Sequence, residues 1–151
     1  MPFQFSLQPV LRLYAGHERM ERLRLLTIAA ALVRIRQEIA AIDRENLRIR
    51  QSVQTKMASG LAAAELHFEL MAETVRLERK RLFLGQAADL EKKQQTQRKI
   101  YDALRQKLKV FQNLREQQRE EYRVIESRRE QRQLDEMFLL TRNHVGTAEP
   151  E

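Results

Sequence analysis

Residues 25–53, LLTIAAALVRIRQEIAAIDRENLRIRQSV, decide the fold of this chain. Apolar residues recur in this stretch at alternating spacings of three and four, with one polar interruption at an a position of the heptad. The positions are Leu25, Ile28, Leu32, Ile35, Ile39, Ile42, Asn46, Ile49 and Val53. A sustained period of this kind predicts a helix that supercoils with another helix. The stripe therefore needs a partner, which is either a second copy of the chain or the rest of the same chain.

The composition is that of a coiled coil rather than of a compact globule. Of the 151 residues, 32% are charged and 6% are aromatic, and neither Trp nor Cys occurs. Without cysteine there is no disulfide and no thiolate metal site. No apolar run approaches the roughly 20 residues that span a membrane, and the N-terminus lacks a signal sequence, so we expect a cytoplasmic protein without direct membrane insertion. The net charge of +7 favours acidic partners.

Proline and glycine indicate where the helices begin and end. Proline occurs only at positions 2, 9 and 150, and the helical pattern stops inside the chain only at the glycine-containing segment 57–61. We therefore expect helix one over about 8–56, a turn at 57–61, helix two over about 62–142 and a flexible tail over 143–151. The predicted fold is all-α, a single domain over residues 1–151 in which two long helices form an antiparallel coiled-coil hairpin.

We expect leucines on helix two to form the required partner stripe. Facing residues in an antiparallel hairpin have numbers that add to a constant, and one such register closes five apolar layers. The layers are Val53/Leu66, Ile49/Leu70, Ile42/Leu77, Ile35/Leu84 and Leu32/Ala87. The same register places Asn46 opposite Glu73. Helix one has no residues left to pair beyond Phe111, so we expect helix two to overhang as a single helix from Arg115 onwards.

Enzymatic and nucleic-acid motifs are missing from the chain. It has no glycine-rich phosphate loop, and His17, His67 and His144 lack the spacing of a metal pair. Long helices without a pocket cannot exclude water from reacting groups, so we expect no enzyme, no cofactor and no metal. The basic run at residues 79–81 has no aromatic interleaving, and we interpret it as a solvated face rather than a nucleic-acid site.

Two features of the predicted helices indicate specific roles for their residues. A polar residue at an a position fixes the register at some cost in stability, so we assign Asn46 as register-setting and expect Asn46→Leu to raise the melting temperature. Helix two also carries a second apolar stripe, roughly 150° from the leucines, which a two-helix hairpin cannot bury at the same time. Its members are Phe68, Met71, Val75 and Leu82. We predict that this second stripe docks a partner protein.

Three stretches together resemble the FliJ proteins of flagellar type III export. They are FSLQPVLRL at 5–13, SGLAAAEL at 59–66 and EQRQLDEM at 130–137, and the likeness extends over nearly the full length. The resemblance implies a stalk-like coiled coil that inserts into the hexameric export ATPase and promotes its assembly and activity. It also implies contacts with the membrane export gate and with substrate-specific export chaperones, at the inner face of the cell membrane. Such a protein serves flagellum assembly and motility.

Carried onto this chain, the resemblance implies two contact regions. The open end of the hairpin would enter the ATPase ring through Leu7, Leu11, Leu134, Met137 and Phe138. The stripe of Phe68, Met71, Val75 and Leu82 would meet the export gate. The family often has a Tyr and a Phe just after the reversal, whereas this chain has Phe68-Glu-Leu-Met71.

Two alternatives stay open at the level of sequence. One is a structural coiled coil that self-associates through residues 25–53, whereas the stalk interpretation predicts a monomer when free. The other is the equivalent stalk protein of a virulence secretion injectisome. The sequence does not distinguish the flagellar system from the injectisome.

Overall fold

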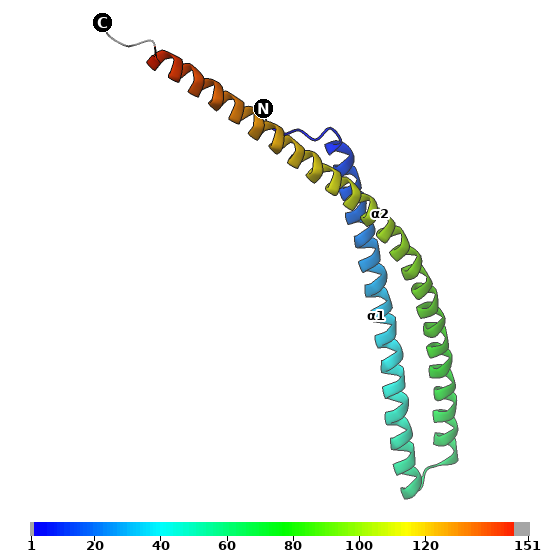
Figure 1. The fold of residues 1–151 in the computed structure, drawn as a ribbon. Coiled ribbons are helices and arrows are strands. Elements are labelled where there is room, and N and C mark those ends of the chain that lie inside the picture. The colour runs from blue at the N-terminus through cyan, green and yellow to red at the C-terminus, as the bar shows by residue number, and fades with distance from the viewer. Residues whose placement is uncertain (1, 147–151) are drawn as a thin grey trace. The chain divides into compact units, whose positions relative to one another are not determined.

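Two long α-helices make up nearly all of the computed structural model, which describes residues 2–146. Helix α1 runs over Gln8–Ser59 and helix α2 over Ala63–Gly146 (Figure 1). The all-α prediction with two long helices packed against each other is confirmed. Helix α1 ends three residues later than predicted, and α2 continues past residue 142 to Gly146. Of the expected tail, residues 147–151 lie outside the described part.

The reversal between the helices is centred on glycine, as the sequence predicts. Gly60 has a φ of 95°, in the left-handed region that a side chain rarely occupies. This is the usual way to end an α-helix, because the left-handed residue turns the chain away from the helix axis. The Ser59 hydroxyl donates to the Lys56 carbonyl at 3.1 Å, and the Glu65 amide donates to the Ala62 carbonyl at 3.1 Å. These bonds satisfy backbone groups on both sides of the turn.

The chain divides into two compact units. One unit comprises Glu18–Ala103 and contains the turn, and we call it the hairpin unit. The other combines residues 1–17 with residues 104–151, and we call it the terminal unit. Both helices contribute to each unit.

In the hairpin unit, the seam of α1 is covered as predicted. Every position of the heptad from Leu25 to Val53 is at least half-buried, and Leu32 and Ile42 are buried together with Ala87 of α2. Helix α2 runs antiparallel beside α1 along this stretch (Figure 1). In this structure the second half of the same chain therefore covers the stripe.

The predicted face of α2 is wrong in its middle part. Leu70, Leu77 and Leu84 are 46–54% exposed and lie beside the seam rather than in it. The covered positions of α2 follow a different heptad phase and are mostly polar near the turn. They are Leu66, Glu69, Glu73, Arg76, Lys80, Phe83, Ala87 and Leu90. Of the predicted layers, only the α2 members Leu66 and Ala87 keep their covered places.

Polar contacts across the hairpin unit explain this choice of face. Arg50 of α1 contacts Glu73 at 2.5 Å, Lys80 contacts Asp43 at 2.6 Å, and farther along Arg36 contacts Glu91 at 2.9 Å. Long charged side chains bury their aliphatic stems against the apolar seam while their ends stay in water and find a partner. Exposed ion pairs contribute only about 0–1 kcal/mol each, so the stems supply the covering and the charges select the face.

In the terminal unit, the N-terminal segment packs along α2. Phe5 and Leu11 are buried, and the rings of Tyr14 and Phe111 stack with centroids 5.2 Å apart. Phe3 lies 5.7 Å from the ring of Tyr122, also between centroids. The covered stretch of α2 thus reaches Glu126, so the overhang predicted from Arg115 begins later. Residues 2–6 precede α1, and an extended chain covers about twice the length per residue that a helix does, which explains the longer reach.

We predict that an apolar layer at Asn46 stabilises the hairpin unit. Asn46 is 8% exposed, and its Oδ1 accepts a hydrogen bond from Arg76 Nε at 2.6 Å. Replacing both partners, in Asn46→Leu with Arg76→Leu, should raise the free energy of unfolding by about 1–3 kcal/mol, because neither polar group is then buried. Thermal unfolding followed by circular dichroism measures this change.

The matched control is Arg76→Leu alone, which leaves the buried Asn46 amide without its partner and should lower the melting temperature. A double variant that melts below the parent protein would contradict an energetic cost of Asn46 in the seam.

Candidate functional site

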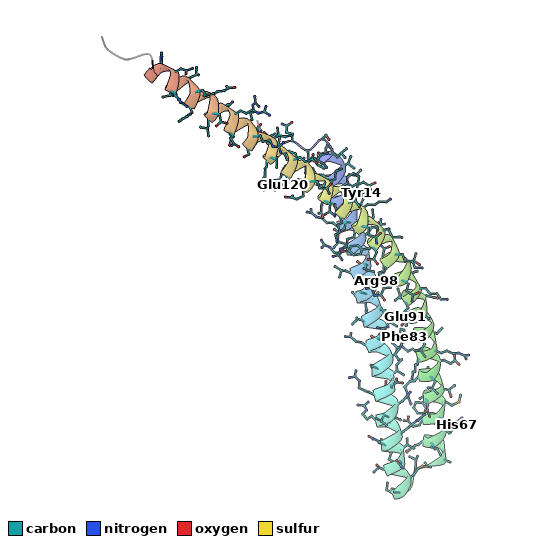
Figure 2. All side chains as sticks on the ribbon, viewed as in Figure 1. Tyr14, His67, Phe83, Glu91, Arg98 and Glu120 are labelled. Atoms are coloured by element: carbon teal, nitrogen blue, oxygen red, sulfur yellow. The ribbon has the colours of Figure 1, made fainter. Side chains whose placement is uncertain are left out.

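Metal-binding side chains do not cluster in the described part of the chain. Within residues 2–146, no group of three or more His, Asp or Glu side chains is placed to hold a metal ion. His67 lies on the outer side of α2, away from α1 (Figure 2). None of the helices, over the same residues, has a stretch both long and apolar enough to cross a bilayer. The candidate functional features are instead exposed apolar surfaces on long helices.

The first surface is the stripe of Phe68, Met71, Val75 and Leu82 on α2, in the hairpin unit. Its side chains are 58–71% exposed, as the prediction of an unburied stripe requires. The stripe lies roughly 150° round α2 from the covered residues, and Phe68 also borders a groove with Val53 and Lys56 of α1. We call these four residues the tip stripe.

The misplaced leucines enlarge the apolar surface near the turn. Leu70, Leu77 and Leu84 repeat every seven residues and lie about 80° from the seam. Leu70 also borders a groove of about 310 Å³ between the two helices, together with Ile49, Val53, Met57 and Leu66. The predicted register has these leucines inside the hairpin, whereas α2 is apolar on its flank as well as on its outer side.

The second surface is the C-terminal part of α2, in the terminal unit. Leu134, Met137, Phe138, Leu139 and Leu140 are 56–69% exposed, and from Ser127 to His144 every residue is exposed. Three Glu/Arg pairs at i, i+3 spacing support the helix that leads to it. The pairs are Glu116/Arg119 at 3.8 Å, Glu120/Arg123 at 3.5 Å and Glu126/Arg129 at 3.8 Å. We call Leu134, Met137 and Phe138 the overhang cluster.

Two residues predicted to contact a ring do not share this exposure. Leu11 is 6% exposed and Leu7 is half-buried, because both pack inside the terminal unit. Their side chains hold the N-terminal segment on α2 and are not free to meet another protein in this conformation. The structure therefore does not bring them together with the overhang cluster into one exposed surface.

The basic run at residues 79–81 is partly engaged within the hairpin unit. Lys80 pairs with Asp43, and the guanidinium of Arg79 lies 5.5 Å from the ring centre of Phe83. A cation held over an aromatic face, or paired with a carboxylate, is less available for phosphates. Arg81 is exposed. The run does not form a continuous basic patch.

Comparison with known protein families gives a match over almost the whole chain. The family described as Flagellar FliJ protein matches residues 3–144, almost the whole chain. The chain belongs to the FliJ family. Searches of curated proteins and of solved structures gave no match. The FliJ family places the protein among the non-catalytic coiled-coil components associated with flagellar protein export.

One surface of this FliJ protein was not anticipated from the sequence. The outer side of α1 in the hairpin unit carries a stripe that repeats at spacings of three, four and seven. Its members are Met20, Leu23, Leu26, Ala30, Val33, Ala40 and Leu47, and all are exposed. The signal is present in the sequence, but the stronger stripe from Leu25 to Val53 on the same helix masks it.

We predict that Tyr122 titrates at high pH because of its place in the terminal unit. Partial burial, then the negative charge of Glu126 and a hydrogen bond to it, raise the pKa of the Tyr122 hydroxyl above its ordinary 10.0. The folded state thus holds the proton more tightly than the unfolded chain. The resulting stabilisation is complete below pH 10.0 and is lost as the pH rises through the folded-state pKa.

Removing the neighbouring ring tests this cause. Phe3→Ala should move the pKa of Tyr122 down towards its ordinary value, measured by ultraviolet absorbance of the tyrosinate in a Tyr14→Phe, Tyr101→Phe background. Phe138→Ala, in the exposed part of α2, is the control and should leave the titration where it was. An unchanged titration in Phe3→Ala would show that Phe3 does not cover Tyr122 in solution.

Proposed function

We propose that this FliJ-family protein is the central stalk of the hexameric flagellar export ATPase. In this role it promotes assembly and turnover of the ATPase, and it links the ATPase to the membrane export gate and to substrate-specific chaperones. It works at the inner face of the cell membrane and is a monomer when free. The observation that carries the proposal is the overhang cluster, an apolar group on a single helix that no described residue of α1 covers.

The overhang cluster supplies the ring contact in this proposal. Three neighbouring large apolar side chains in water are costly, since covering each one contributes about 1.5–3 kcal/mol. Methionine and phenylalanine are well suited to protein contacts because one adapts in shape and the other buries a large area. Leu7 and Leu11 keep a supporting role, because they fix the N-terminal segment against α2.

A single helical rod also has the asymmetry that a stalk needs. A sixfold ring offers six equivalent surfaces, and one asymmetric helix cannot contact all six alike. It therefore biases the subunits unequally, which can order their ATP cycles. No residue of the stalk has to touch nucleotide, in keeping with the lack of a phosphate-binding loop in the sequence.

The tip stripe supplies the contact with the export gate. Phe68 is 71% exposed and Val75 69% exposed, and the stripe follows one side of α2 at helical spacing. A partner groove that accepts one face of an amphipathic helix recognises side chains at such spacings. The exposed Leu70, Leu77 and Leu84 lie on a separate flank of α2, roughly 150° from the tip stripe.

We predict that the overhang cluster is required for ATPase stimulation. Met137→Ser with Phe138→Ser should raise the concentration for half-maximal stimulation of a flagellar export ATPase about tenfold, because two apolar contacts are lost. The matched control is Leu13→Ser with Val110→Ser, two exposed apolar residues of the same unit. Stimulation by the parent protein of an injectisome ATPase, with none of the flagellar enzyme, would favour the injectisome alternative. Full stimulation by the Met137/Phe138 variant would place the ring contact elsewhere.

We predict separately that the tip stripe is required for gate binding. Phe68→Ala with Met71→Ala should weaken binding to the purified cytoplasmic domain of the export gate protein at least tenfold, measured by titration calorimetry. Circular dichroism should show unchanged helicity, because both side chains are mostly exposed. The control pair, Leu13→Ala with Val110→Ala, should bind as the parent does. Retained affinity in the Phe68/Met71 variant would remove the tip stripe from the gate contact.

A further inference from the structure

The outer side of α1 carries an apolar stripe to which neither the ring nor the gate contact is assigned. We call Met20, Leu23, Leu26, Ala30, Val33, Ala40 and Leu47 the outer stripe. Its five large side chains are 52–62% exposed, and the stripe lies roughly 150° round α1 from the buried seam. It extends over residues 20–47, about 40 Å of helix, within the hairpin unit. No described residue covers it.

Arginines border the outer stripe. The stripe or its two edges contain Arg22, Arg34, Arg44 and Arg48, and all four are exposed. None of these four forms an ion pair within residues 2–146, whereas Arg36 and Arg50 are paired with glutamates of α2. The carboxylates Glu38 and Glu45 lie farther round the helix from the stripe than Arg34 and Arg48 do. The unpaired charge beside the stripe is therefore positive.

The width of the stripe indicates what it fits. A helix that lies on a membrane needs an apolar face wider than about 100°, whereas a stripe restricted to two heptad positions is the seam of a coiled coil. Apart from Met20, the outer stripe occupies two positions per heptad, and polar Gln37 and Arg44 fall within it. This geometry favours a helix as the occupant over a lipid surface.

The positive charge beside the outer stripe indicates which kind of partner helix fits the stripe. Residues that flank a coiled-coil seam select partners through opposite charge. A second copy of this chain would bring a net charge of +7 against the same arginines, which disfavours self-association at this surface. The complementary partner has Glu or Asp on both sides of its apolar stripe.

We propose that the outer stripe of α1 docks an amphipathic helix of a partner protein whose apolar face is bordered by acidic side chains. The partner helix lies along residues 20–47, with its aliphatic side chains between Leu23 and Leu47 and its carboxylates on the four unpaired arginines. This surface is separate from the overhang cluster and from the tip stripe. Its occupancy does not depend on the ring or gate contacts.

The probe is a fluorescently labelled synthetic helix of about 28 residues with Leu at a and d and Glu at e and g. Repulsion between its own glutamates keeps it from pairing with itself. A second probe has the same leucines and Lys at e and g. The full-length protein should bind the Glu probe at least tenfold more tightly than the Lys probe by fluorescence anisotropy, and added salt should weaken the Glu complex. Equal affinity for the two probes would overturn the proposal.

Two variants locate the binding on α1. Arg22→Glu/Arg34→Glu/Arg48→Glu should reverse the preference, so that the Lys probe binds more tightly than the Glu probe. Arg105→Glu/Lys107→Glu/Lys109→Glu changes the net charge equally on exposed positions of α2 and should keep the original preference. Leu26→Ser with Val33→Ser should weaken binding of both probes while circular dichroism shows unchanged helicity. An original preference that survives the α1 reversal would overturn the proposal.

Anionic vesicles test whether a lipid surface, rather than a helix, occupies the outer stripe. Vesicles of phosphatidylglycerol should bind the parent and the Leu26/Val33 variant alike, because lipid attraction then rests on overall charge. Vesicle binding that falls in the Leu26/Val33 variant, with no loss of Glu-probe binding, would assign the outer stripe to a membrane surface and overturn the helix proposal.

Discussion

The apolar seam of α1 must be removed from water, and the rest of the molecule is organised by how that is done. Nine consecutive heptad positions from Leu25 to Val53 are covered, yet α2 presents few large apolar side chains to them near the turn. Glutamate, arginine and lysine stems lie on the seam instead, with their charged ends paired to α1 at Arg50 and Asp43. This division leaves the leucines of α2 at the surface. A hairpin closed with leucines on both helices would have had less apolar surface left for partners.

The fold was predictable because its strongest signals are local. The period of the seam, the lack of proline in the interior and the single glycine turn at Gly60 each depend on a few neighbouring residues, and all three agree with the structure. The face of α2 was not predictable in the same way. Leu70, Leu77 and Leu84 form a regular pattern, but the aliphatic stems of charged side chains can cover a seam as well as leucines can. The positions of Arg50 and Asp43 across the hairpin favour the face of α2 that carries the charged residues.

The candidate sites show the same limit. The exposure of Phe68 and Val75 follows from having two stripes on one helix, and the sequence indicated it. The ring contact expected of Leu11 comes from the family resemblance rather than from hydrophobic spacing, and Leu11 is instead covered within the terminal unit. The outer stripe of α1 was not predicted because the seam on the same helix has the stronger apolar pattern. Alanines and polar residues interrupt the pattern of the outer stripe.

Each helix has both an inner seam and outward apolar stripes, so fewer of its exposed positions are polar than in a helix with a seam alone. In an ordinary two-stranded coiled coil, the side chains that point outward drift freely between polar types over evolution. Here the outer stripe lies on the side of α1 opposite the seam. On α2, the tip stripe lies on the side opposite the covered residues, and three leucines lie on its flank. We therefore expect substitutions at exposed positions to be tolerated unevenly. They should be tolerated best in the narrow strips of surface that lie between the apolar stripes.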